Sequence, residues 1–162
     1  MKTKYPLILL ATLLVFGQPQ RVLCQQLSVQ ALDGKQTVLT KAEIEALPHV
    51  KVSASEHGQT AGFEGVALRS VLEKAGVGLG ETLHGKAMAS CLLVEAADGY
   101  RVVFALPELD SGFTDKQITL VFLKDGKPLD QKEGPYRIVV PDEKRMARWV
   151  RQVTALKIVD VK

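Results

Sequence analysis

The residues with the most chemical potential lie near the C-terminal end, in "GPYRIVVPDEKRMARWVRQV", residues 134–153. This stretch places five Arg and Lys side chains around a short apolar strand and the only tryptophan of the chain. Strand alternation puts Arg137 on the same face as Val139, where a charged head must be paired or must reach solvent. Two outcomes satisfy Arg137: a bound anion, held by charge-assisted hydrogen bonds, or a salt bridge to a nearby carboxylate. The candidate carboxylates are Glu133, Glu108 and Asp142.

The overall charge argues against nucleic acid as the partner of these cations. The chain has 21 Lys and Arg and 18 Asp and Glu, but Lys2, Lys4 and Arg21 fall in the first 24 residues, where there is no acidic residue. Residues 25–162 therefore carry 18 cations and 18 anions, a net charge of zero. Nucleic-acid binders usually carry a marked basic excess, because phosphate neutralisation dominates their affinity. We expect no nucleic-acid partner.

The first 24 residues have the pattern of a secretory signal peptide. Two lysines precede a mostly apolar run of twelve residues, 5–16, which is too short to span a bilayer. The sequence "VLC" offers a cleavage site after Cys24. We expect a mature domain of residues 25–162 that is periplasmic or secreted, with no membrane span; an uncleaved anchor is the alternative. Cys91 then stands alone, so no intrachain disulfide is expected.

The pattern of strands and turns favours an α+β fold with a mixed or antiparallel sheet. Two strands are expected about the turn Asp33-Gly34, and Thr40 and Glu43 have the spacing of a capping box that starts a short helix. Residues 66–77 show helical spacing of apolar residues. There is no regular βαβ alternation. Further strands are expected within residues 49–55, 86–109, 117–129, 136–141 and 153–161, and a polar, glycine-rich loop over 55–65.

The segment 142–153 permits two geometries, a helical turn or an extended strand. In both, a solvated cationic face is the simpler interpretation for Lys144, Arg145 and Arg151. Arg148, next to Trp149, is the exception that we single out as a binding residue.

Four blocks of the sequence resemble one known family when they are taken together and in order. They are "FEGVALRSVLEKAGV", "AADGYRVVFALPELD", "LVFLKDGKPLDQKEGPYRIVVP" and "ARWVRQVTALKIV". Between Phe63 and Ile158 the chain resembles the molybdopterin-binding domain of the sulfite-oxidase family. The resemblance implies that Arg137 and Arg148 contact the phosphate of the pterin cofactor, and that Tyr100 is a catalytic residue facing the metal and the substrate. From its pattern alone, Tyr100 is an ordinary packing residue after a hairpin turn.

The resemblance breaks down at the metal ligand. In the family a cysteine thiolate holds molybdenum in the loop before the helix that follows the aromatic-x-Gly-Val motif, but the corresponding stretch here, "VSASEHGQTAGFEG", contains no cysteine. Ser55 stands near its place and His57 lies in the same loop, so we name both as cofactor-contacting candidates. A serine hydroxyl is a much poorer metal ligand than a thiolate. We therefore predict no metal ligand set, and the three histidines have no zinc spacing.

Three functions follow as hypotheses, and the sequence leaves enzymatic activity open. The first is an exported domain that is degenerate at the metal site and binds a small anion or a pterin cofactor through Arg137 and Arg148. The second is an active molybdenum-cofactor oxidoreductase with unusual ligation and an envelope redox partner. The third is a non-catalytic accessory or structural protein of the envelope, in which salt bridges close the pocket.

Overall fold

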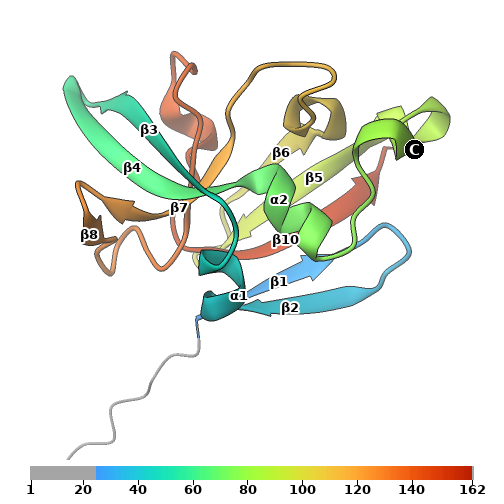
Figure 1. Cartoon of the computed structure of the whole chain (residues 1–162), viewed down its shortest axis with the longest axis horizontal. Coiled ribbons are helices and arrows are strands. Elements are labelled where there is room, and N and C mark those ends of the chain that lie inside the picture. Colours follow the sequence, from blue (N-terminus) through green and yellow to red (C-terminus); the bar gives the residue numbers. More distant parts are fainter. Residues whose placement is uncertain (1–24, 162) are drawn as a thin grey trace, which may run out of the picture.

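The computed structural model describes residues 25–161, which form two β-sheets with short helices between and beside them (Figure 1). Residues 1–24, the predicted signal peptide with its cleavage site, lie outside the described residues. Within residues 25–161 no helix is long and apolar enough to cross a membrane.

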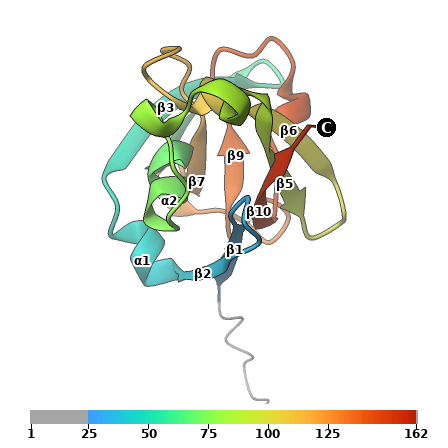
Figure 2. The ribbon, with the colours of Figure 1, turned by 90° about the vertical axis from the view of Figure 1, so that its right-hand side faces the viewer.

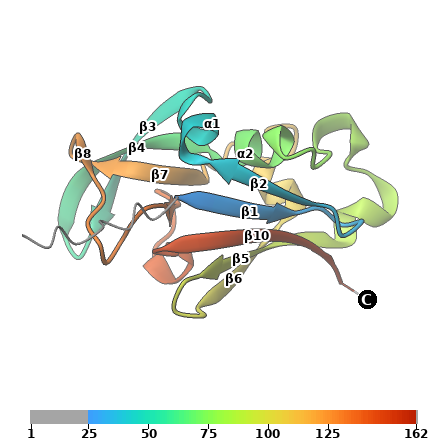
Figure 3. The same cartoon turned by 90° about the horizontal axis from the view of Figure 1, so that it is seen from below.

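The first sheet, sheet A, is mixed and five-stranded, in the order β2-β1-β10-β5-β6. β1 pairs with β10 in parallel, and every other pairing in the sheet is antiparallel. The last strand of the chain thus lies in the middle of the sheet, between β1 and β5 (Figure 3). The strands are β1 (Gln26–Gln30), β2 (Gln36–Thr40), β5 (Ser90–Ala96), β6 (Arg101–Ala105) and β10 (Val153–Asp160).

The second sheet, sheet B, is antiparallel and runs β3-β4-β7-β8, with β9 also paired to β7. Figure 2 shows β7 and β9 side by side. The register places Arg137 of β9 opposite Val121 of β7. The strands are β3 (His49–Glu56), β4 (Gln59–Ala67), β7 (Thr119–Lys124), β8 (Lys127–Pro128) and β9 (Arg137–Val139).

The two α-helices are short and begin close to where the sequence predicts. α1 (Lys41–Glu45) starts with the expected capping box, in which the Thr40 hydroxyl accepts from the Glu43 N–H and the Glu43 carboxylate accepts from the Thr40 N–H. α2 (Leu68–Lys74) is shorter than expected, because Val66 belongs to β4. Single 3₁₀ turns are η1 (Gly80–Thr82), η2 (Gly85–Ala89), η3 (Leu106–Leu109) and η4 (Met146–Arg148). The α+β fold with mixed and antiparallel sheets is confirmed.

One hydrophobic core joins the two sheets. Both sheets and both helices contribute fully buried side chains, for example Leu27, Ile44, Phe63, Leu72, Leu92, Leu120 and Leu156. Trp149 is buried among them, and its indole N–H donates to the Val140 carbonyl at 3.0 Å. The tryptophan therefore fixes the segment after β9 to the core.

Two local expectations were wrong or incomplete. Residues 55–65 are not a loop: β3 and β4 continue into a tight hairpin whose turn residues, His57 and Gly58, have φ values of 51° and 82°. Such positive φ angles at both central residues are what two-residue hairpin turns require. Ala61 and Phe63 are buried, while Thr60, Gly62 and Glu64 alternate with them on the more exposed phase of the strand. The segment 142–153 adopts neither expected geometry before β10; it makes the 3₁₀ turn η4 instead.

Candidate functional site

Arg137 lies at the centre of a buried ion cluster. Its side chain is 1% exposed. Nη2 donates to Glu56 Oε1 at 2.7 Å and Nη1 to Glu56 Oε2 at 3.2 Å, so that the pair is bidentate, and Nη1 also donates to Glu133 Oε1 at 2.7 Å. The guanidinium lies beside both Phe63 and Trp149, with Cζ 5.6 and 5.5 Å from the two ring centroids, and the two rings meet edge to face. Of the two outcomes left open for Arg137, the structure shows the salt bridge, with Glu133 as one of its partners.

Glu56 is the hub of this cluster. Besides Arg137, its carboxylate accepts from Lys124 Nζ at 2.9 Å and lies 3.6 Å from Arg151 Nη2. Hydrogen bonding from Arg137 lowers the pKa of Glu56 to about 2, against the opposing effect of burial. Glu56 was not among the residues predicted from the sequence. The strand alternation could have predicted its burial, because Glu56 lies on the same face of β3 as the buried Val52 and Ala54.

A hollow of about 350 Å³ opens beside the cluster, at the tip of the β3–β4 hairpin. His57 lines it from the hairpin turn, whereas Ser55 does not line it, since Ser55 points outward on the other phase of β3. Arg151 lies at its margin with 51% of its side chain exposed. The full lining consists of Glu56, His57, Gln59, Thr60, Ala61, Lys124, Asp125, Glu133 and Arg151.

Arg148 belongs to a second ion cluster, built on η4. Its Nε donates to Glu143 at 2.8 Å and its Nη2 to Glu108 at 3.1 Å. Lys116 Nζ adds a 2.8 Å contact to Glu108. The guanidinium also covers the ring of Phe104, with Cζ 4.4 Å from the centroid. Burial would raise the pKa of Glu108, but hydrogen bonds from Arg148 and Lys116 outweigh it and lower that pKa to about 2.

Arg148 and Tyr100 lie along the edge of sheet A. Arg148 Nη1 donates to the carbonyl of Val103 on the edge strand β6 at 3.3 Å. Tyr100, 48% exposed after the β5–β6 turn, donates its hydroxyl to the carbonyl of Ala147 at 2.7 Å. These contacts attach the η4 segment to the edge of β6.

The structure does not bring Arg137 and Arg148 together at the hollow beside the Arg137 cluster, because neither of them lines it. Each guanidinium is neutralised by two carboxylates of its own, from different parts of the chain. Of the predicted site residues, His57 lines the hollow beside the Arg137 cluster. Tyr100 and Arg148 share the η4 region, and Ser55 faces outward.

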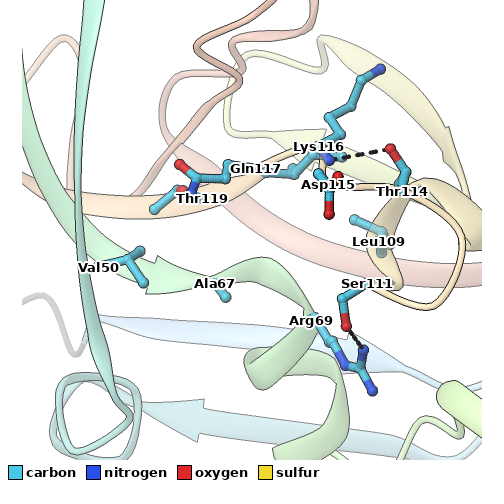
Figure 4. Close-up of a pocket in the computed structure, with 11 residues that line it drawn as sticks. Val50, Ala67, Arg69, Leu109, Ser111, Thr114, Asp115, Lys116, Gln117 and Thr119 are labelled. Carbon is cyan, nitrogen blue, oxygen red and sulfur yellow. Dashed lines mark hydrogen bonds between the residues drawn. The ribbon is translucent and has the colours of Figure 1, made fainter.

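A second hollow, of about 290 Å³, lies between sheet B, the start of α2 and the loop before β7 (Figure 4). Its two cations are paired: Arg69 donates to Ser111 at 2.9 Å and to Asp110 at 3.0 Å, and Lys116 Nζ donates to Glu108 at 2.8 Å. None of the residues named from the sequence lines this hollow.

Comparison with known proteins is decisive for the family. The family model described as the oxidoreductase molybdopterin-binding domain matches residues 19–162. The chain belongs to this molybdopterin-binding domain family. A search of curated proteins gives no match.

A solved structure supports the family fold. The chain is similar to the sulfane dehydrogenase SoxCD of Paracoccus pantotrophus, with a TM-score of 0.65 and 21% sequence identity over 85% of this chain. It spans 38% of the SoxCD chain, so this likeness concerns the fold. The resemblance to the sulfite-oxidase type of domain, found from the four sequence blocks, is confirmed at the level of family and fold.

Molybdopterin, which the family name implies, does not fit the side chains of this site. Both terminal nitrogens of Arg137 are already bound by carboxylates, and Glu56 would repel an incoming phosphate. The one cysteine within residues 25–161, Cys91, is on β5 in sheet A, and burial raises its thiol pKa, which disfavours a thiolate ligand. Among the described residues no group of three or more His, Cys, Asp or Glu side chains could hold a metal ion.

Proposed function

We propose that this protein is an exported member of the molybdopterin-binding domain family that has lost molybdenum chemistry and serves as a non-catalytic accessory domain. The observation that carries the proposal is the bidentate pair between Arg137 and Glu56, completed by Glu133. An arginine that has to bind a cofactor phosphate needs free donors, and here the protein's own carboxylates occupy them.

The hairpin geometry supports the same conclusion. A metal-binding loop has to present its ligand inward, yet β3 and β4 are joined by only His57 and Gly58, with Ser55 directed outward. A neutral serine hydroxyl would in any case bind molybdenum weakly. In the accessory role we expect the domain to act through binding another envelope protein, with export directed by residues 1–24.

Metal and pterin analysis tests this proposal. The full chain, with its own N-terminal segment, should be produced in a host that makes molybdenum cofactor, and the exported protein should be purified without chelators. We expect no more molybdenum, and no more fluorescence from oxidised pterin, than an unrelated exported protein carries. One molybdenum and one pterin per chain would overturn the proposal in favour of an oxidoreductase.

The Ser55→Cys variant provides the matched comparison. Because the Ser55 side chain points away from the hollow, a thiol at this position should not acquire molybdenum either. Molybdenum in the variant but not in the parent protein would show that the lost thiolate alone, and not the closed ion cluster, prevents cofactor binding. Sequencing the N-terminus of the exported protein tests the predicted start at Gln25.

A further inference from the structure

The Arg137 cluster carries an unbalanced positive charge. Salt bridges link three cations, Arg137, Lys124 and Arg151, to two carboxylates, Glu56 and Glu133, which gives 3 − 2 = +1 for the paired groups. One further carboxylate, Asp125, lines the hollow and accepts from the Gly62 N–H at 2.9 Å. The guanidinium is also one acceptor short, because the buried Arg137 Nε has no hydrogen-bond partner among the described residues. A buried guanidinium with an unused donor is costly, so one more hydrogen-bond acceptor at Arg137 would be stabilising.

Glu56 has the geometry of a ligand rather than of an ordinary surface partner. Its two oxygens bind the two terminal nitrogens of Arg137 side by side, which is the arrangement that phosphate and sulfate adopt on arginine. It reaches Arg137 from 81 positions earlier in the chain, at the last residue of β3. The next residue, His57, lines the hollow, so the space beyond the carboxylate is open.

We propose that Glu56 is a built-in anion that closes an oxyanion site around Arg137, and that removing its charge turns the hollow into a site for a small inorganic oxyanion such as phosphate. The inference builds on the proposed function, since it explains how a cofactor-binding domain can keep its buried arginine without a cofactor. Its chemistry is electrostatic substitution: one carboxylate of the chain replaces one oxyanion of a ligand.

The Glu56→Gln variant tests the inference, because it keeps the size of the side chain and removes one charge, leaving 3 − 1 = +2 in the cluster. Phosphate should raise the melting temperature of the variant above its value in chloride of equal ionic strength, and should leave the parent protein unchanged. From the dependence on phosphate concentration we expect an affinity at least about tenfold higher than that of the parent. Adding Arg137→Gln to the Glu56→Gln variant should abolish the response.

The matched control is Glu108→Gln, which makes the same change of charge beside Arg148. This cluster is partly exposed, and its carboxylates, Glu108 and Glu143, line neither the hollow at the hairpin tip nor the one beside α2, so no phosphate response is expected. A response equal to that of Glu56→Gln would overturn the inference, because it would be a general effect of charge. Absence of a response in folded Glu56→Gln would also overturn it.

Glu133→Gln gives a second route if Glu56→Gln does not fold, since Glu133 also holds Arg137. This variant should show a weaker phosphate response, and none would contradict the inference. If neither variant folds in chloride, refolding in phosphate is the readout: recovery supports the site, and no recovery overturns it. These outcomes are separate from the proposed function, which the metal and pterin content of the parent protein decides by itself.

Discussion

Arg137 and Arg148 make nearly the same contacts in two different surroundings. Each is held by two carboxylates and each lies against an aromatic ring, but the Arg137 side chain is 1% exposed and that of Arg148 is 26% exposed. When one partner of a buried pair is lost, the other stays in a low-dielectric interior with its charge uncompensated. Water can solvate the carboxylates left by the second arginine. The number of ion pairs that an arginine makes therefore does not indicate its contribution to the free energy of unfolding unless the burial of its side chain is also known.

The largest expected effect comes from Arg137→Met. The substitution keeps most of the apolar stem but removes the buried bidentate donor of Glu56 and the direct partner of Glu133, and it leaves these carboxylates only the more exposed Lys124 and Arg151. We expect the free energy of unfolding to fall by about 3–5 kcal/mol, measured by urea denaturation at pH 7. A loss below about 1 kcal/mol would mean that the cluster is more hydrated than its burial indicates.

Arg148→Met makes the same chemical change in the other cluster and should cost less. We expect a loss of about 1 kcal/mol or less, because Lys116 remains beside Glu108 and water reaches the site. The contribution of Arg148 should shrink further in 1 M salt, where the screening length is about 3 Å, whereas that of Arg137 should persist. Equal losses for both arginines at high salt would remove the distinction between the clusters.

Acid should weaken both clusters in the same pH window. The pKa values of Glu56 and Glu108 are lowered from 4.5 to about 2 in the folded protein. Between these values the unfolded chain binds more protons than the folded one, so the free energy of unfolding is highest above about pH 4.5 and falls as the pH drops towards 2. Unfolding measured from pH 6 to 2 should show a shallower decline in Arg137→Met than in the parent protein. Parallel curves would show that Glu56 does not owe its low pKa to Arg137.

The smallest effect is expected for Tyr100→Phe. Only one exposed hydrogen bond, to the Ala147 carbonyl, is lost, so the free energy of unfolding should change by about 0.5 kcal/mol or less. Thermal unfolding of the variant and of the parent protein provides the measurement. A loss above about 1.5 kcal/mol would mean that the attachment of η4 to the edge of sheet A matters more than its exposure suggests.

Sequence signals that act within a few residues predicted most of the fold, but they did not predict contacts between residues far apart in the sequence. Turn pairs such as Asp33-Gly34 and the capping box at Thr40 and Glu43 act within a few residues, and the elements beside them were expected correctly. β4 was missed because its glycines and polar residues hide the alternation of Ala61 and Phe63. The burial of a charged residue on β3 could have been predicted from its phase.

The partner of that buried charge could not have been predicted from the sequence. Glu56 and Arg137 meet only because β3, β4, β7 and β9 are adjacent in one sheet, which brings together residues 81 positions apart. Arg148 likewise binds one carboxylate nearby in the sequence, Glu143, and one that is 40 positions away, Glu108. The choice between a free and a neutralised arginine therefore depended on tertiary structure.

The central place of β10 has a consequence for how this chain matures. Sheet A cannot close until residues 153–160 are available, because they join β1 to β5. A chain still emerging from the ribosome, or still passing through a translocation channel, lacks that strand and is left with the separate hairpins β1–β2 and β5–β6. Contacts between such distant segments form late and slowly. This arrangement would delay compaction until synthesis is complete, and it would keep the chain unfolded long enough for the export that we propose.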